Sequence, residues 1–228
     1  MRKPSVHRYG EVRVIAPETV EAIRARLEPL DATLISVLAY AGLRPWSEAV
    51  ALSWDDVGEQ ALRVYAPKTR RSRSVRLLGP LRADLRAFRL ASGRPPGRAP
   101  VFGTWGQHTP RAWSRRVWQP AVKAVGLPES TRPYDLRHSF ASLLIAEGQT
   151  AVEVAAQLGH SPVMTLETYA HVFGEFEPGS RVPAEERIRG AGESRIGRDL
   201  ALPAPNRPNR RPAGRLNRSS ARRTGPST

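Results

Sequence analysis

The sequence predicts a mixed α/β domain that is mainly α-helical and carries one small antiparallel β-sheet. Apolar residues recur at helical spacing from residue 17 onward, beginning with Val20, Ile23 and Leu27. Residues 62–65 and 75–77 instead alternate in polarity as short strands do, with a turn at residues 67–70 between them. The sheet is therefore predicted between the helices before residue 54 and those after residue 80.

Capping signals place the individual helices. Pro17 stands at a tolerated first-turn position, and Gly42 ends a second, largely buried helix that Asp31 can cap. Ser47 can cap the short helix that follows. Three further helices are predicted over residues 80–91, 110–125 and 134–147.

The helix after residue 150 has a clear start and a clear end. Residues 150–153 form a capping box, in which the Thr and Glu side chains satisfy each other's end-of-helix amides. This helix ends at Gly159, and Ser161 with Pro162 restarts the chain as cap and first-turn proline. His160 is therefore predicted in a tight turn between two helices.

The charge and the composition narrow the function classes. The 228 residues carry a formal net charge of +15, which favours a polyanionic partner, although a solvated basic surface would give the same number. The absence of cysteine excludes disulfides, Cys-bound zinc and thiol catalysis. No apolar run approaches the ~20 residues of a membrane span, and the N-terminus has no apolar signal segment. We therefore expect a cytoplasmic protein with no membrane partner.

The composition changes along the chain and suggests four parts. Residues 1–16 read as a basic extended lead-in, and residues 17–174 as the folded domain. Residues 175–199 form a C-terminal segment in which a short helix can start near Pro183. Residues 200–228 contain seven arginines, five prolines and no acidic residue, so we expect a disordered tail.

An arginine, a histidine and a tyrosine follow one another as Arg137, His160 and Tyr169, and Tyr169 falls about two turns into its helix. Arginine offers a fixed fork of donors to a phosphate, histidine a hydrogen-bonding group at neutral pH, and tyrosine a phenolic nucleophile. Taken singly, each residue is more often structural. Their order, together with Arg44 in Gly42-Leu43-Arg44-Pro45, favours phosphoryl-transfer chemistry.

From about Val14 to about Phe173 the pattern resembles the catalytic domain of tyrosine recombinases, the phage-integrase family. The resemblance implies the fold of that catalytic domain. It also implies that the protein cleaves and rejoins double-stranded DNA through a covalent 3′-phosphotyrosyl intermediate. It implies further protomers assembled on the DNA, and a C-terminal segment that docks on a neighbouring protomer. No cofactor and no metal are expected, because two arginines can neutralise the phosphate.

The resemblance also implies a role for each site residue. Arg44 and Arg137 clamp the phosphate, and Tyr169 is the nucleophile. His160 matches the histidine of the family's L-G-H motif, and Lys68 matches the lysine that protonates the leaving 5′ oxygen. A solvated basic hairpin is the rival interpretation of Lys68, which lies among several arginines.

Two positions depart from the family's pattern. Tyr134 stands where the H-x-x-R box has its histidine; a phenol can donate to a phosphate but does not titrate near pH 7. Tyr134 can equally be a packed aromatic. Glu48 lies four residues after Arg44, one more than in the commonest form of the first box, and is interpreted as fold support. His138 and His171 are interpreted as structural or surface residues.

Two other functions stay open. The same chemistry serves type IB topoisomerases, which the resemblance also covers. Complete family members usually carry an N-terminal core-binding domain, and this chain begins just before the catalytic domain, so a truncated, non-catalytic DNA-binding remnant is the other alternative.

Overall fold

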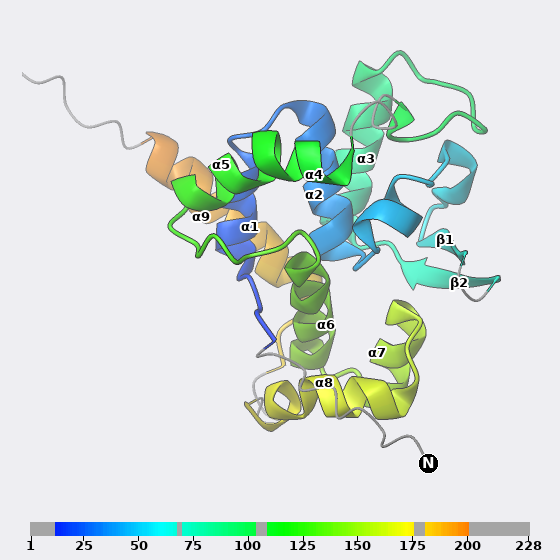
Figure 1. Cartoon of the computed structure of the whole chain (residues 1–228), viewed down its shortest axis with the longest axis vertical. Helices are drawn as coiled ribbons and strands as arrows, with labels where there is room; N and C mark the ends of the chain where they lie inside the picture. The colour runs from blue at the N-terminus through cyan, green and yellow to red at the C-terminus, as the bar shows by residue number, and fades with distance from the viewer. Residues whose placement is uncertain (1–11, 68–69, 104–108, 176–180, 201–228) are drawn as a thin grey trace, which may run out of the picture.

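The computed structural model describes residues 12–67, 70–103, 109–175 and 181–200. Within these ranges it is mainly helical with one two-stranded antiparallel sheet, which confirms the predicted fold class (Figure 1). The elements are α1 (Pro17–Arg24), α2 (Pro29–Tyr40), η1 (Pro45–Ala49), η2 (Trp54–Asp56), β1 (Ala61–Ala66), β2 (Arg71–Arg76), α3 (Gly79–Ala91), α4 (Pro110–Trp113), η4 (Ser114–Trp118), α5 (Gln119–Ala124), α6 (Asp135–Glu147), α7 (Ala151–Leu158), α8 (Pro162–Glu175) and α9 (Ala184–Leu200).

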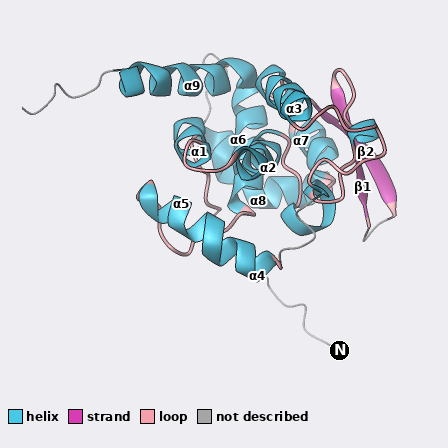
Figure 2. Ribbon diagram, turned by 90° about the horizontal axis from the view of Figure 1, so that it is seen from above, coloured by secondary structure: helices cyan, strands magenta, loops and turns pink. Residues whose placement is uncertain are grey.

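Helix α2 lies at the centre of the domain. Every residue from 33 to 40 is buried, as expected of a helix that is apolar on all sides. Figure 2 shows α2 nearly end-on, surrounded by other helices, with the β hairpin at the edge of the domain. Asp31 does not cap α2, which begins two residues earlier at Pro29; its carboxylate instead accepts a hydrogen bond from Trp113 Nε1 at 2.7 Å.

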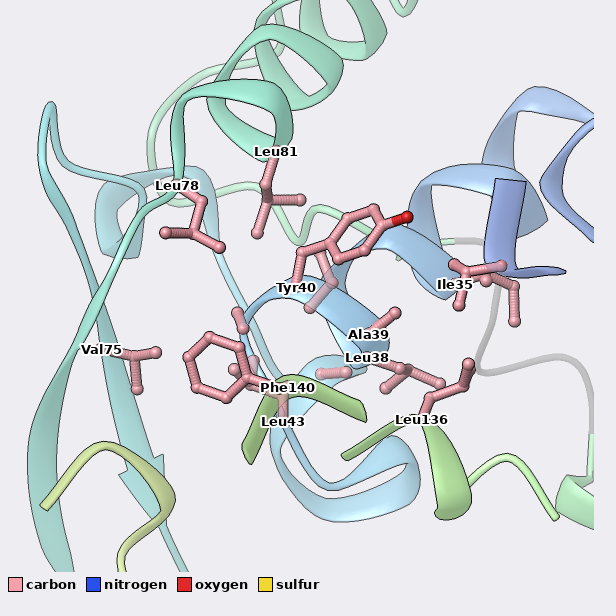
Figure 3. Close-up of a cluster of buried hydrophobic side chains, with 14 of the residues drawn as sticks. Ile35, Leu38, Ala39, Tyr40, Leu43, Val75, Leu78, Leu81, Leu136 and Phe140 are labelled. Atoms are coloured by element: carbon pink, nitrogen blue, oxygen red, sulfur yellow. The ribbon is translucent and has the colours of Figure 1, made fainter. Parts of the chain in front are cut away.

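The hydrophobic core joins the central helix to the sheet and to α6. Figure 3 shows Leu38 and Tyr40 of α2 close to Val75 of β2, Leu81 of α3 and Phe140 of α6. All five side chains are at most 1% exposed. The elements that carry the candidate site residues are therefore fixed to one core.

The β hairpin pairs Ala61 with Arg76 at one end and Ala66 with Arg71 at the other. Its second strand is tied to α7 through Gln157. The Gln157 side-chain oxygen accepts from the Arg76 amide, and its carbonyl accepts from Arg73 Nε, both at 2.8 Å. The hairpin is thereby held against the helix that leads to His160.

The C-terminal helices begin and end largely where the local signals place them. Gly148 follows α6 with φ +97°, and the predicted capping box opens α7. Gly159 follows α7 with φ +66°, so the chain turns sharply before Pro162 begins α8. None of the helices in the described ranges is both long and apolar enough to cross a membrane.

Helix α9 is much longer than the short helix expected near Pro183. It has 17 residues and packs mainly on α1, with Ala184, Ile188 and Ala191 buried. Glu185 in its first turn accepts a hydrogen bond from the Gly79 amide at 3.0 Å. In this single chain α9 therefore covers its own domain. The predicted tail, apart from Leu200, lies outside the described residues.

Candidate active site

The first site segment follows the end of α2. Gly42 has φ +61°, and η1, a single turn of π-helix, starts directly after Arg44. The Ala49 amide donates to the Arg44 carbonyl at 3.0 Å, a hydrogen bond that spans five residues instead of four. A π-turn accommodates one extra residue in a helical segment, which accounts for the unusual spacing between Arg44 and Glu48. Ser47 lies inside this turn and does not cap it.

Glu48 is only 3% exposed, and it is the centre of a buried charge cluster. Its carboxylate accepts from the Arg44 amide at 2.9 Å and from both terminal nitrogens of Arg73 at 2.8 Å. It also forms an ion pair with Arg44, and Arg137 Nη1 lies 3.7 Å away. Burial raises the pKa of Glu48, but the bonds from Arg73 and from the Arg44 amide outweigh it and lower the pKa to about 2. A permanent carboxylate thus holds three arginines together.

Arg137 lies beneath this cluster and is 1% exposed. Its guanidinium donates to the carbonyl oxygens of Gly42 and Leu158. Its Nη2 also lies 3.1 Å from His160 Nε2. Burial and the nearby charge of Arg44 lower the pKa of Arg137 to about 10, so it remains a cation at neutral pH. Its Nε is buried without a partner among the described residues.

His160 occupies the predicted turn between α7 and α8. Burial, reinforced by the charge of Arg137, lowers the pKa of His160 to about 3, so the imidazole is neutral. Because arginine can only donate, Nε2 of this ring accepts, and the proton must sit on Nδ1. His160 Nδ1 is buried with no partner in the described part of the chain. The Nδ1–H group of His160 is therefore a hydrogen-bond donor that no described residue accepts from.

Tyr169 lies in the middle of α8 and is 0% exposed, so its hydroxyl is covered in this structure. Its hydroxyl lies 2.8 Å from His138 Nδ1. Burial raises the pKa of the phenol above its ordinary value, and the charge of Arg137 acts in the opposite direction. Tyr134, just before α6, is 39% exposed and has its ring edge-on to His138 at 5.5 Å. The phenol of Tyr169 is thus protonated and hydrogen-bonded to a histidine.

A cavity of about 940 Å³ opens beside the Glu48 cluster and His160. Arg44, Arg71, Arg73 and His160 line it, together with the end of β1 and the residues that follow. Such a cavity can hold a phosphate between cationic side chains. Lys68 lies outside the described residues, but its neighbour Pro67 lines this cavity.

The sequence interpretation missed two residues of this arrangement. Arg73 looked like one of several arginines in a basic hairpin, yet its side chain is turned inward onto Glu48. His138 was interpreted as structural or surface, yet it is the hydrogen-bond partner of Tyr169. The alternation of β2 and the helical spacing of Tyr134 and His138 were the only signals available for them.

Comparison with known proteins gives one consistent picture. The model of the Phage integrase family matches residues 13–175. A tyrosine recombinase XerC from Rhodospirillum centenum is 32% identical over 170 residues, which are 73% of this chain and 49% of that protein. A tyrosine recombinase XerC from Azotobacter vinelandii is 34% identical over 147 residues, which are 62% of this chain and 48% of that protein. This chain spans about half the length of the curated relatives it matches.

The solved structures agree at the level of the fold. The crystal structure of XerA recombinase has a TM-score of 0.56 at 20% identity and covers 81% of this chain and 65% of that one. The XerH site-specific recombinase bound to its difH substrate, in a pre-cleavage complex, has a TM-score of 0.57 at 17% identity. That match covers 80% of this chain and 54% of the XerH chain.

Proposed function

Since this chain belongs to the phage integrase family, we propose that it is the catalytic domain of a site-specific DNA recombinase. It cleaves and rejoins double-stranded DNA through a covalent 3′-phosphotyrosyl intermediate, with Tyr169 as the nucleophile. The observation that carries the proposal is the cluster around Glu48 and Arg137. It gathers Arg44, Arg137 and His160 beside one cationic cavity, although they lie far apart in the sequence.

The described contacts suggest how a phosphate is held. Arg44 lines the cavity and is oriented by Glu48, so it binds a non-bridging oxygen where charge develops in the transition state. The Nδ1 donor of His160 and the Nε donor of Arg137 are buried and lack partners among the described residues, so they can donate to further phosphate oxygens once the site opens. Lys68 protonates the leaving 5′ oxygen, as the family resemblance implies. Tyr134 occupies the histidine position of its box and provides a second phenolic donor.

The buried position of Tyr169 implies a resting state. A nucleophile that is 0% exposed cannot reach a phosphodiester until the groups that cover its hydroxyl move aside. Catalytic contacts often tighten only when substrate is bound, so DNA binding selects the open state.

A suicide substrate that traps the covalent adduct tests the proposal. A duplex of a target sequence, nicked near the cleavage site, loses its short leaving strand and leaves the protein attached to DNA. Wild-type chain should form an adduct that mass spectrometry maps to Tyr169, and Tyr169→Phe should form none. Arg44→Lys should slow the adduct about 100-fold or more, because a compact ammonium cannot reproduce the guanidinium fork.

Other outcomes select the alternatives. DNA binding without any adduct would indicate a non-catalytic remnant. Relaxation of supercoiled plasmid by a single protomer, without a sequence requirement, would indicate a topoisomerase-like enzyme. We place the activity in the cytoplasm, where the proposed DNA substrate of a bacterial-type recombinase lies.

We further propose that several protomers assemble on the DNA and that α9 takes part. Its buried face, formed by Ala184, Ile188 and Ala191, covers α1 of the same chain, so the same contact can form between two chains if α9 is exchanged. Analytical ultracentrifugation with and without a target duplex tests this role. Assembly on DNA that is unchanged after removal of residues 176–199 would refute it.

A further inference from the structure

The contact between His138 and Tyr169 has no role in the function proposed so far. His138 lies in the first turn of α6, one helical turn after Tyr134, and Tyr169 lies on α8. The phenolic oxygen is 2.8 Å from His138 Nδ1, and the two rings meet edge to face with centroids 5.6 Å apart. The reacting atom of the proposed nucleophile therefore already has an imidazole partner.

The direction of this hydrogen bond follows from the protonation states. Burial raises the pKa of Tyr169, so the phenol keeps its proton and donates it to Nδ1. Burial lowers the pKa of His138, which Asp135 opposes and Arg137 reinforces, so the ring is neutral at pH 7. His138 Nδ1 thus accepts from the hydroxyl and its proton sits on Nε2.

The other histidine of the site is engaged elsewhere. His160 directs Nε2 at Arg137 and carries its proton on Nδ1, so it is set up to donate. Tyr134, at the position where the family's box has a histidine, is a phenol and a poor base at neutral pH. Among the described residues, His138 is the histidine whose acceptor nitrogen touches the Tyr169 hydroxyl.

We propose that His138 is the general base of strand cleavage, a role that rests on the proposed function. As the Tyr169 oxygen bonds to phosphorus, the phenolic proton passes to His138 Nδ1. The bond between phosphorus and the 5′ oxygen breaks, and the leaving oxygen takes a proton from the general acid, Lys68. In rejoining, the imidazolium returns its proton to the departing phenolate. A histidine one turn along α6 thereby replaces the imidazole that Tyr134 lacks.

The charges around His138 fit this exchange. Asp135 on α6 stabilises the imidazolium, whereas Arg137 on α6 opposes it. His160 is close enough that the charge of His138 acts on it, and the rings of Tyr134 and Tyr169 meet the imidazole edge-on. A neutral base at rest and a short-lived cation during the reaction are both compatible with these neighbours.

The full chain and two suicide substrates separate a base from an acid. One substrate is ordinary, and the other has sulfur in place of the bridging 5′ oxygen. Sulfur leaves as a thiolate and needs no proton from an acid. His138→Gln should slow adduct formation about 100- to 10,000-fold on both substrates, the usual range for a lost proton-transfer group. Lys68→Ala should be slow on the ordinary substrate alone, and rescued by sulfur.

Glutamine is chosen because its side-chain oxygen can still accept from the phenol, which preserves the packing. His171→Gln, an exposed histidine on α8, is the matched control and should react like wild type. Two readouts separate proton transfer from a structural role. Imidazole added to His138→Ala should restore part of the rate, and the wild-type rate should rise with pH through a pKa below the ordinary value, a rise that His138→Gln loses.

Each result decides the role. If His138→Gln forms the adduct at the wild-type rate, the proposal is overturned. A faster rate would also overturn it, because it would mean that the contact with His138 holds the Tyr169 hydroxyl in an unreactive position. Rescue of His138→Gln by sulfur would make it part of the acid and also overturn the proposal. If His138→Gln has a much lower melting temperature than wild type, the imidazole titration of His138→Ala decides, and absence of rescue refutes the base. If the wild-type protein forms no adduct on either substrate, the proposed function itself is refuted.

Discussion

Replacing Glu48 with glutamine should destabilise the domain strongly, because the carboxylate is shared by three arginines. The variant keeps the shape of the side chain, removes its charge and replaces one acceptor oxygen with an NH2 donor. Arg44 and Arg73 then lose the carboxylate that they share, and the buried Arg137 loses a counter-charge 3.7 Å away. Breaking a buried ion pair by removing one partner costs about 3–5 kcal/mol.

The lowered pKa of Glu48 gives a similar free energy for the contribution of the carboxylate to stability. A fall from 4.5 to about 2 on folding corresponds to about 3 kcal/mol of stability. Since the folded pKa is lowered, this stability is fully present above pH 4.5 and is lost as the pH falls toward 2. For a domain of this size, about 3 kcal/mol corresponds to roughly 6–12 °C in melting temperature.

Thermal and denaturant unfolding at pH 7 and at lower pH measures both effects. Glu59→Gln is the matched control, because Glu59 pairs with Arg86 while both side chains are mostly exposed, at 80% and 63%. Such a pair contributes about 0–1 kcal/mol. If Glu48→Gln costs no more than Glu59→Gln, or if its cost is the same at pH 7 and pH 3, the central role of the carboxylate is wrong.

Three further outcomes are expected. Gly42→Ala should lower the free energy of unfolding, measured with denaturant, by at least about 2 kcal/mol, since φ is +61° and the new Cβ would lie 2.5 Å from the Phe140 ring. Gly126→Ala is the control, because it meets only the backbone strain at φ +74°; equal costs would contradict the clash. Deleting residues 200–228 should weaken DNA binding on all sequences alike and flatten its salt dependence, without slowing cleavage of bound DNA; a loss confined to the target duplex would contradict this. Cleavage should persist in EDTA, and its loss in EDTA with recovery in magnesium would show that a metal is required.

Local signals were enough to predict the outline of the fold. The capping box at residues 150–153, Gly159 and Pro162 act within a few residues of chain, so they placed the His160 turn correctly. The alternation on either side of residues 67–70 likewise predicted the hairpin. The spacing of Arg44 and Glu48 was noticed, but only the structure identified a π-turn as its physical form.

The remainder depended on tertiary contacts. Arg73 and Glu48 are 25 residues apart in the sequence, and His138 and Tyr169 are 31 residues apart. Contacts between residues so far apart produce no periodic pattern that the sequence alone could reveal. Helix α9 was predicted only as a short helix starting near Pro183, and Gly190 and Gly192 within it disfavour a helix. Its packing on α1 outweighs that preference and extends the helix to 17 residues.

The two carbonyl oxygens that hold Arg137 belong to Leu158, the last residue of α7, and to Gly42, which lies two residues past the end of α2. A helix leaves its last carbonyls unpaired and concentrates negative charge there, so Arg137 serves as a C-terminal cap for α7 and also holds the turn that follows α2. An inactive Arg137 variant has for that reason two possible defects, a lost phosphate ligand and a loosened end of α7. Arg137→Lys, which keeps the charge but not the fork, can be interpreted as a catalytic defect only at a temperature where its α7 amides exchange with solvent as slowly as those of the wild type.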